Sequence, residues 1–355
     1  MPVNEALAQY SNWTYTSAVA IYVLAMFFYL AEQAFGRSRA AATAATATSR
    51  TLITVGPGGE LIENPAEDLS DESESGPAES TDSVPPRPPS DTTSDTTSAL
   101  PGQRSLPERL GRMGVSLTVL GVGFHLMSIV LRGLSAHRWP LGNMYEFMSF
   151  VCLIAMIAWL VMLRRFAIRR LGAFVLLPVV VLMFLGGTVL YTQAAPLEPA
   201  LQSYWLTIHV TVISAASGIL LVPGVASLLY LLRGAYDRNP ARFTRLGPKL
   251  PSVDTLDRLA YRMTIFGFPL FTFGIICGAI WAESAWGRYW GWDPKETTAF
   301  VAWVIYAGYL HARATAGWRG SRAAVINIIG LAVMIFNLFF VNLVITGLHS
   351  YAGVG

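Results

Sequence analysis

The sequence predicts an all-α protein, a polytopic membrane helix bundle with about eight transmembrane helices. Of its 355 residues, 53% are hydrophobic and only 13% are charged, and the mean hydropathy of +0.47 is too high for an ordinary soluble domain. Several apolar runs also reach the ~20 residues that an α-helix needs to cross a hydrocarbon core. Composition and run length together favour an integral membrane protein.

The apolar runs divide the chain into eight predicted spans, with ends placed to within about 2–4 residues. The first span follows a polar, acidic start at Asn4 and Glu5 and lacks both a basic segment and a small-residue cleavage site. We therefore expect it to be a retained helix rather than a removed signal peptide. The eight spans are 14–35, 112–134, 144–163, 171–191, 205–232, 262–282, 296–314 and 323–346.

Three regions follow from this division. Residues 1–36 form an N-terminal transmembrane helix, and residues 109–355 form a seven-helix domain with a tryptophan-rich loop at 286–296. Residues 37–108 between them are rich in Ser, Thr, Pro, Ala and acidic residues. Such a stretch buries too little apolar area to offset its chain entropy, so we expect a disordered acidic linker that acts as a tether.

Basic residues gather in alternate connections between the predicted spans. The positive-inside rule places the side that carries them in the cytoplasm, together with the linker. We therefore expect both termini and the loops 135–143, 192–204 and 283–295 to face outward, and we expect no nucleic-acid partner. The basic clusters run from Arg37 to Arg39, from Arg164 to Arg170, from Arg233 to Lys249 and from Arg313 to Arg322.

The two cysteines, Cys152 and Cys277, both fall inside predicted spans, and the sequence contains no Cys-x-x-Cys motif. This pattern argues against thiol–disulfide exchange and against a covalent c-type haem on this chain. We expect both to be small buried apolar residues.

The loop 286–296 has the most distinctive composition in the chain, because it combines tryptophans, glycines and both signs of charge. Aromatic faces bind large flat apolar ligands, and glycines allow the backbone to approach them closely. An interfacial aromatic belt is the competing interpretation, although a belt needs neither the glycines nor the Trp-Asp-Pro ending. The residues of the expected platform are Trp286, Gly287, Arg288, Tyr289, Trp290, Gly291, Trp292 and Asp293.

The predicted topology sorts the five histidines. His209 and His349 both fall at the outer face, beside the tryptophan loop. Two imidazoles near an aromatic surface suit haem iron, whereas zinc would need three or four closely spaced ligands. His311 lies inside a span near its cytoplasmic end, and ionisable groups there are usually functional. For His125 and His137 a packing or hydrogen-bonding role is favoured over ligation.

Several charged residues near the loop have structural alternatives. Asp293 and Glu296 fit the N-cap and the capping box of a helix with Pro294 at its first position, so we expect helix starters rather than catalytic acids. Arg288 and Lys295 could each pair with a haem propionate or reach toward the membrane interface. Tyr145 and Glu146, which open span 144–163 on the same outer side, are candidates for groups that support the site. No residue is predicted to be a general acid or base.

The segment 286–296 resembles the tryptophan-rich "WWD" signature of haem-handling proteins in cytochrome c maturation. The order of His209, this signature, His311 and His349 is similar to that in the CcsA (ResC) branch, the system II cytochrome c synthesis proteins. The segment 137–146 also resembles an element of that branch that ends in Asn-x-Tyr-Glu. The resemblance covers about residues 110–355.

The resemblance implies a haem-lyase component in a bacterial plasma membrane that works with a CcsB (ResB) membrane partner. The pair exports haem b as cargo and presents it to the Cys-x-x-Cys-His motif of apocytochrome c, and a thioredoxin-like thiol reductase is a further expected partner. His209 and His349 would be the outer axial ligands, and His311 would belong to an inner site completed by the partner. Two alternatives stay open: a haem exporter or chaperone without the covalent step, and a non-haem transporter or scaffold.

Overall fold

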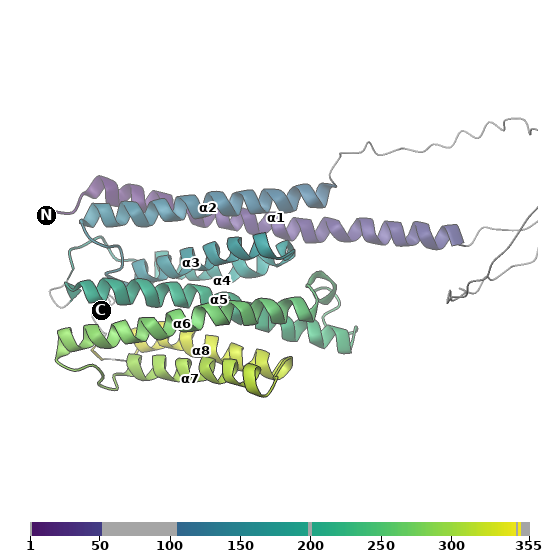
Figure 1. Cartoon of the computed structure of the whole chain (residues 1–355). Coiled ribbons are helices and arrows are strands. Elements are labelled where there is room, and N and C mark those ends of the chain that lie inside the picture. Colours follow the sequence, from purple (N-terminus) through teal and green to yellow (C-terminus); the bar gives the residue numbers. More distant parts are fainter. Residues whose placement is uncertain (1, 52–104, 198–200, 346, 349–355) are drawn as a thin grey trace, which may run out of the picture. The chain divides into compact units, whose positions relative to one another are not determined.

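The computed structural model describes residues 2–51, 105–197, 201–345 and 347–348, with side chains left out of the description at 36–51. Within these ranges the regular structure is helical, which confirms the all-α prediction (Figure 1). The eight long helices are α1 (Glu5–Thr51), α2 (Leu106–Ala136), α3 (Met144–Arg165), α4 (Gly172–Thr188), α5 (Tyr204–Arg238), α6 (Val253–Trp286), α7 (Pro294–Thr315) and α8 (Ser321–Leu343).

Seven of these helices, counted over the described residues, are long and apolar enough to cross a membrane. The eighth, α7, corresponds to the predicted span 296–314 and carries charged residues at both of its ends. Helix α1 continues to Thr51, beyond the predicted end at residue 36. Six alanines between residues 40 and 47 give this extension a high helix propensity. The remainder of the predicted linker, 52–104, lies outside the described residues.

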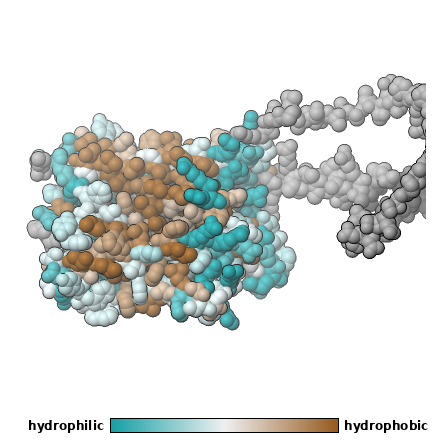
Figure 2. All heavy atoms as spheres, in the orientation of Figure 1, coloured by the Kyte–Doolittle hydropathy of each residue, from teal (hydrophilic) through white to brown (hydrophobic). Residues whose placement is uncertain are grey.

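The helices run alternately up and down, so that their connections gather at two opposite ends of the bundle (Figure 1). Apolar residues cover the middle of the visible face, and hydrophilic residues lie toward the ends (Figure 2). One end carries the loops 137–143 and 287–293, and the other carries the arginine-rich connections. We call them the loop end and the arginine end. Helix α5 is central, because it packs against α3, α6 and α8.

The largest apolar core lies where α1, α3, α4 and α5 meet, and it includes the fully buried Trp159. Tyrosines of α1 fit against glycines of its neighbours. The ring of Tyr22 occupies the space where a Cβ on Gly121 of α2 would lie, only 2.6 Å from that position. Tyr15 lies against Gly186 of α4 and donates its hydroxyl to the carbonyl oxygen of Met183 at 2.6 Å. Tyrosine rings of α1 therefore fill spaces left by glycines of its neighbours.

Candidate ligand-binding cavity

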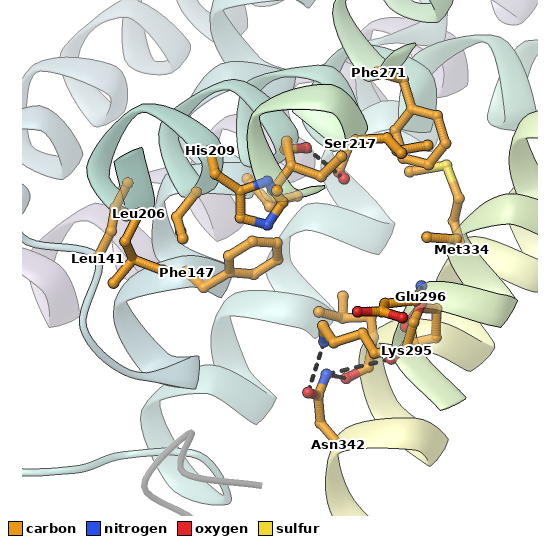
Figure 3. Close-up of a pocket in the computed structure, with 18 of the residues that line it drawn as sticks. Leu141, Phe147, Leu206, His209, Ser217, Phe271, Lys295, Glu296, Met334 and Asn342 are labelled. Carbon is orange, nitrogen blue, oxygen red and sulfur yellow. Dashed lines mark hydrogen bonds between the residues drawn. The ribbon is translucent and has the colours of Figure 1, made fainter. Parts of the chain in front are cut away.

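A cavity of about 220 Å³ lies at the loop end, in the other half of the bundle. Its walls come from α3, α5, α6, α7 and α8, with one residue from α4, and they are mostly apolar. Figure 3 shows His209 on one side of the cavity and Lys295 and Asn342 on the other. Concave, apolar sites with a few placed polar groups are typical of small-molecule binding. The cavity is therefore the leading candidate for a ligand site.

His209 lies on α5 in the cavity wall with its ring held in one orientation. Its Nδ1 lies 2.8 Å from the backbone carbonyl oxygen of Gly274 on α6. A carbonyl oxygen can only accept a hydrogen bond, so Nδ1 carries the proton in this contact. In the neutral ring Nε2 then carries the lone pair, and a histidine that donates its other nitrogen to a carbonyl is a typical metal ligand.

An aromatic wall adjoins this imidazole. The ring of Trp281 lies nearly parallel to that of His209, with 6.2 Å between centroids and 9° between planes. Trp286 meets Trp281 edge to face at 4.8 Å, and both indoles line the cavity together with Trp290 and Tyr289. Flat, polarizable faces of this kind suit a large planar ligand.

The loop between α6 and α7 is held by its own backbone and by one carboxylate. Gly287 ends α6 in the left-handed region at φ 71° and donates its N–H to the carbonyl of Glu283. The Oε2 atom of Glu296 then accepts the backbone N–H groups of Gly291 at 2.9 Å and of Asp293 at 3.1 Å. Trp292 between them has φ 56°, which is rare for a bulky residue. The loop is therefore tightly constrained.

Asp293 caps α7 and also contacts the end of the described chain. The capping box with Glu296 is present, which confirms the prediction that these residues start a helix. In addition, Oδ1 of Asp293 accepts the backbone N–H of Leu348 at 2.8 Å. This bond joins the tryptophan loop to the segment that follows α8. His349, the next residue and a predicted iron ligand, lies outside the described residues.

Lys295 gives the cavity a cationic group opposite His209. Its Nζ donates to Oδ1 of Asn342 at 2.6 Å, and the amide nitrogen of Asn342 donates to the carbonyl oxygen of Leu338 at the same distance (Figure 3). The amide is therefore oriented so that its oxygen meets the ammonium group. A cation at the edge of an apolar cavity can recognise a ligand carboxylate.

Glu146 organises the rim of the cavity. Buried in the first turn of α3, it accepts Nε of Arg132 at 3.0 Å and a bidentate pair from Arg138 at 2.7 and 3.0 Å. It also accepts the backbone N–H of Gly142 at 2.8 Å. Gly142 and the next two residues, Asn143 and Met144, line the cavity. Glu146 thus supports the wall without lining it.

The remaining predicted residues lie away from the cavity. Tyr145 is buried against Tyr15 and Tyr191, with centroids 5.0 and 5.4 Å away. Trp292 is 66% exposed, Arg288 is exposed, and neither lines the cavity.

The other described histidines do not line the cavity either. His125 is fully buried between α1, α2 and α3, with Nε2 2.9 Å from the hydroxyl of Ser149. His137 is exposed in a left-handed conformation at the end of α2. His311 is exposed on α7 near the arginine end. Among the described histidines, only His209 lines the cavity.

Sequence reasoning did not select Trp281 or the glycines of α6. Trp281 lies five residues before Trp286, inside the predicted apolar span 262–282. The segment Gly274-x-x-x-Gly278 is a small-residue motif of the kind that lets two membrane helices approach closely. This motif was the available signal for a close contact between α6 and a neighbour.

Comparison with known proteins agrees with this architecture. Residues 141–349 match the family model described as "Cytochrome C assembly protein". A "Cytochrome c biogenesis protein CcsA" from Chlamydomonas reinhardtii is 36% identical over 265 residues, which cover 72% of this chain and 73% of the relative. The protein with the same description from Mesostigma viride is 34% identical over 272 residues, covering 70% and 88%.

A third relative so described, from Prochlorococcus marinus, is 36% identical over 251 residues, covering 63% of this chain and 79% of its own. The matched region contains the cavity and the whole tryptophan loop. The chain belongs to the cytochrome c assembly protein family, and within it to the CcsA type of cytochrome c biogenesis proteins.

Proposed function

We propose that the cavity binds haem as cargo and that Nε2 of His209 ligates the iron. The observation that carries the proposal is the contact between Nδ1 of His209 and the carbonyl of Gly274, because it leaves Nε2 as the basic nitrogen of a ring in the cavity wall. The parallel indole of Trp281 and the edge of Trp286 supply a flat apolar surface beside it. The imidazole of His209 suits the iron of haem, and the indoles suit its flat ring. The ammonium group of Lys295 suits a propionate.

The second axial ligand in this proposal is His349. It follows Leu348 directly, and the bond from Leu348 N–H to Asp293 keeps that end of the described chain beside the tryptophan loop. Lys295 receives a propionate, because it lines the cavity and its ammonium group is held there by a hydrogen bond to Asn342, which also lines the cavity. Arg288, which is exposed, is the weaker candidate for the other propionate.

The orientation follows from charge. The arginine end faces the cytoplasm of a bacterium, and the loop end, with the cavity, faces outward. In this arrangement the exposed His311 on α7 would belong to an inner haem site completed by a CcsB-type partner. Haem would then pass from that site to the cavity at the outer face.

The covalent step is the attachment of haem to apocytochrome c. Each thiol of a Cys-x-x-Cys-His motif adds across one vinyl group, so that a carbon–sulfur bond forms and the thiol hydrogen goes to the neighbouring vinyl carbon. The substrate histidine takes one axial position. This chain contributes binding, orientation and exclusion of water, while a thioredoxin-like reductase keeps the two thiols reduced.

The test uses the chain co-expressed with a CcsB-type partner and isolated with its haem. His209→Ala is expected to lower haem content about tenfold or more and to change the Soret spectrum, because an axial ligand is lost. Thr207→Ala, two residues before His209 on α5 and outside the cavity lining, is the matched control and should resemble wild type. Unchanged haem content and spectrum in His209→Ala would refute the proposal.

A second measurement separates the two haem functions. The purified complex is mixed with reduced apocytochrome c, and the product is analysed by denaturing electrophoresis with haem staining. Haem that stays on the cytochrome shows thioether formation and therefore a synthase. Haem that is released on denaturation indicates a carrier without the covalent step.

A further inference from the structure

Helices α5 and α6 pack as an antiparallel pair through three glycines of α6 (Figure 1). Gly267 faces Leu220, Gly274 faces Ile213 and Gly278 faces His209. The spacing of seven and then four residues is the same on both helices, so the three contacts form one continuous seam. Two of the three side chains that enter this seam are apolar, and the third is the imidazole.

The seam leaves no room for a methyl group at any of the three positions. A Cβ on Gly267 would lie 2.7 Å from Cδ2 of Leu220, and one on Gly274 would lie 2.9 Å from Cδ1 of Ile213. A Cβ on Gly278 would lie 2.6 Å from Cε1 and 2.7 Å from Nδ1 of His209. Leu220 can move the end of a flexible side chain, whereas an imidazole is a rigid plane and must rotate or shift as a whole.

This geometry bears on ligation, because the same edge of the ring makes the bond to Gly274. Nδ1 is at once the atom that donates to the Gly274 carbonyl at 2.8 Å and one of the atoms nearest to the missing side chain of Gly278. A ring displaced by a methyl group at Gly278 would lose this bond. The bond makes the opposite nitrogen more basic and thereby tunes a bound metal.

We propose that Gly278 is a positioning residue that sets the ring plane and the tautomer of His209, so that Nε2 faces the haem iron. This inference rests on the proposed function and adds to it a cavity-wall residue that acts through the ring of His209. Intrinsic helix propensity makes the prediction sharper, because alanine is favoured over glycine in a helix by about 1 kcal/mol. A loss of function in Gly278→Ala would therefore run against propensity.

The chain offers two matched controls for Gly278→Ala. Gly308→Ala on α7 gains the same propensity and meets nothing within 4 Å. Gly267→Ala strains the same seam between the same helices, but against Leu220 rather than His209. The first control measures the effect of propensity, and the second measures the effect of looser helix packing.

The experiment compares these variants and His209→Ala in the haem-loaded complex with its partner, by electron paramagnetic resonance and by redox titration. Gly278→Ala is expected to shift the low-spin ferric signal and the reduction potential, while Gly267→Ala and Gly308→Ala keep both. Equal shifts in Gly278→Ala and Gly267→Ala would overturn the inference, because packing alone would explain them. So would a wild-type signal in Gly278→Ala.

His209→Ala separates a failure of the proposed haem site from a failure of the role of Gly278. If His209→Ala leaves the haem signal unchanged, the proposed function itself fails. If His209→Ala changes it and Gly278→Ala does not, only the role of Gly278 fails.

A rescue experiment keeps the inference testable if Gly278→Ala does not accumulate. His209→Gly removes the clash and leaves a space that added imidazole can fill. Imidazole should restore low-spin haem in His209→Gly and in His209→Gly/Gly308→Ala, and should restore much less in His209→Gly/Gly278→Ala. Equal rescue in the two double variants would contradict the proposed role.

Discussion

The pairs α1–α2 and α5–α6 both pack antiparallel on glycines, and each carries one histidine at its contact. In α1–α2 two of the glycine spaces are filled by Tyr22 and Tyr29, and the fully buried His125 has its nitrogens 2.9 Å from Ser149 Oγ and 3.5 Å from Tyr22 OH. In α5–α6 the glycine space is filled by His209, whose ring borders a cavity. A buried histidine beside a glycine is therefore not by itself a candidate metal ligand. The candidate is the histidine whose ring also borders a cavity.

The comparison predicts that stability and haem binding respond to different sets of substitutions. Changes at the buried contact between α1 and α2 should lower stability and leave the haem spectrum unchanged. Changes around the cavity should alter haem binding at a smaller cost in stability.

The largest effect on stability is expected for Glu146→Leu, in the buried ion-pair network beside the rim of the cavity. Removal of the carboxylate leaves the buried guanidinium of Arg132 without its ion pair and frees Arg138 from the rim. Breaking a buried pair from one side costs about 3–5 kcal/mol. We expect the unfolding free energy in mixed detergent micelles to fall by that amount, with Glu283→Leu, an exposed site on α6, near zero. Similar stability in both variants would show that the network is not structural.

His125→Leu should destabilise the protein less. The hydroxyls of Ser149 and Tyr22 lose their partner inside the core, which costs about 1–3 kcal/mol. Because His125 does not line the cavity, haem content and the Soret maximum should stay at wild-type values. Phe124→Leu on the exposed face of the same turn is the control. A changed haem spectrum in His125→Leu would break the comparison between the two helix pairs.

Features of the fold that depend on residues close together in the sequence could be predicted, whereas features that depend on how distant helices pack could not. Helix number and order follow from local hydropathy, and the capping box of α7 follows from Asp293 and Glu296, three residues apart. The placement of His209 at the loop end follows from the alternation of the helices. These features need no knowledge of how helices pack.

The features that could not be predicted from the sequence depend on which residues of two distant helices come into contact. Gly278 meets His209 across 69 positions of chain, and only the packing of α6 on α5 brings them together. The same is true of Trp281, whose ring is parallel to His209. The extension of α1 has another explanation, because an alanine-rich stretch with high helix propensity directly precedes acidic, proline-containing residues that disfavour helix.

Asp293→Ala is expected to have a smaller, mixed effect, because Asp293 combines a local role with a tertiary one. Loss of the N-cap should cost about 1 kcal/mol, and Ser252→Ala, which removes the equivalent cap of α6 at the arginine end, should cost the same. Only Asp293→Ala also loses the bond to Leu348 N–H, so only it should alter the haem spectrum. Asp293→Asn keeps an acceptor and should restore both. Equal spectra for the Asp293→Ala and Ser252→Ala variants would mean that the tail contact has no role in ligation.

The smallest effect is expected for Lys295→Met, which keeps the length of the side chain and removes its charge. If Nζ pairs with a propionate, the loss of one hydrogen bond at a partly solvated site costs about 1 kcal/mol, or about fivefold in affinity. Haem dimethyl ester has no free carboxylates, so its affinity should be nearly the same for wild type and Lys295→Met, whereas that of haem should fall. Titration of both ligands into haem-depleted complex measures this difference. A loss that is equal for haem and its ester would assign Lys295 to the contact of α7 with Asn342 of α8 rather than to recognition of a carboxylate.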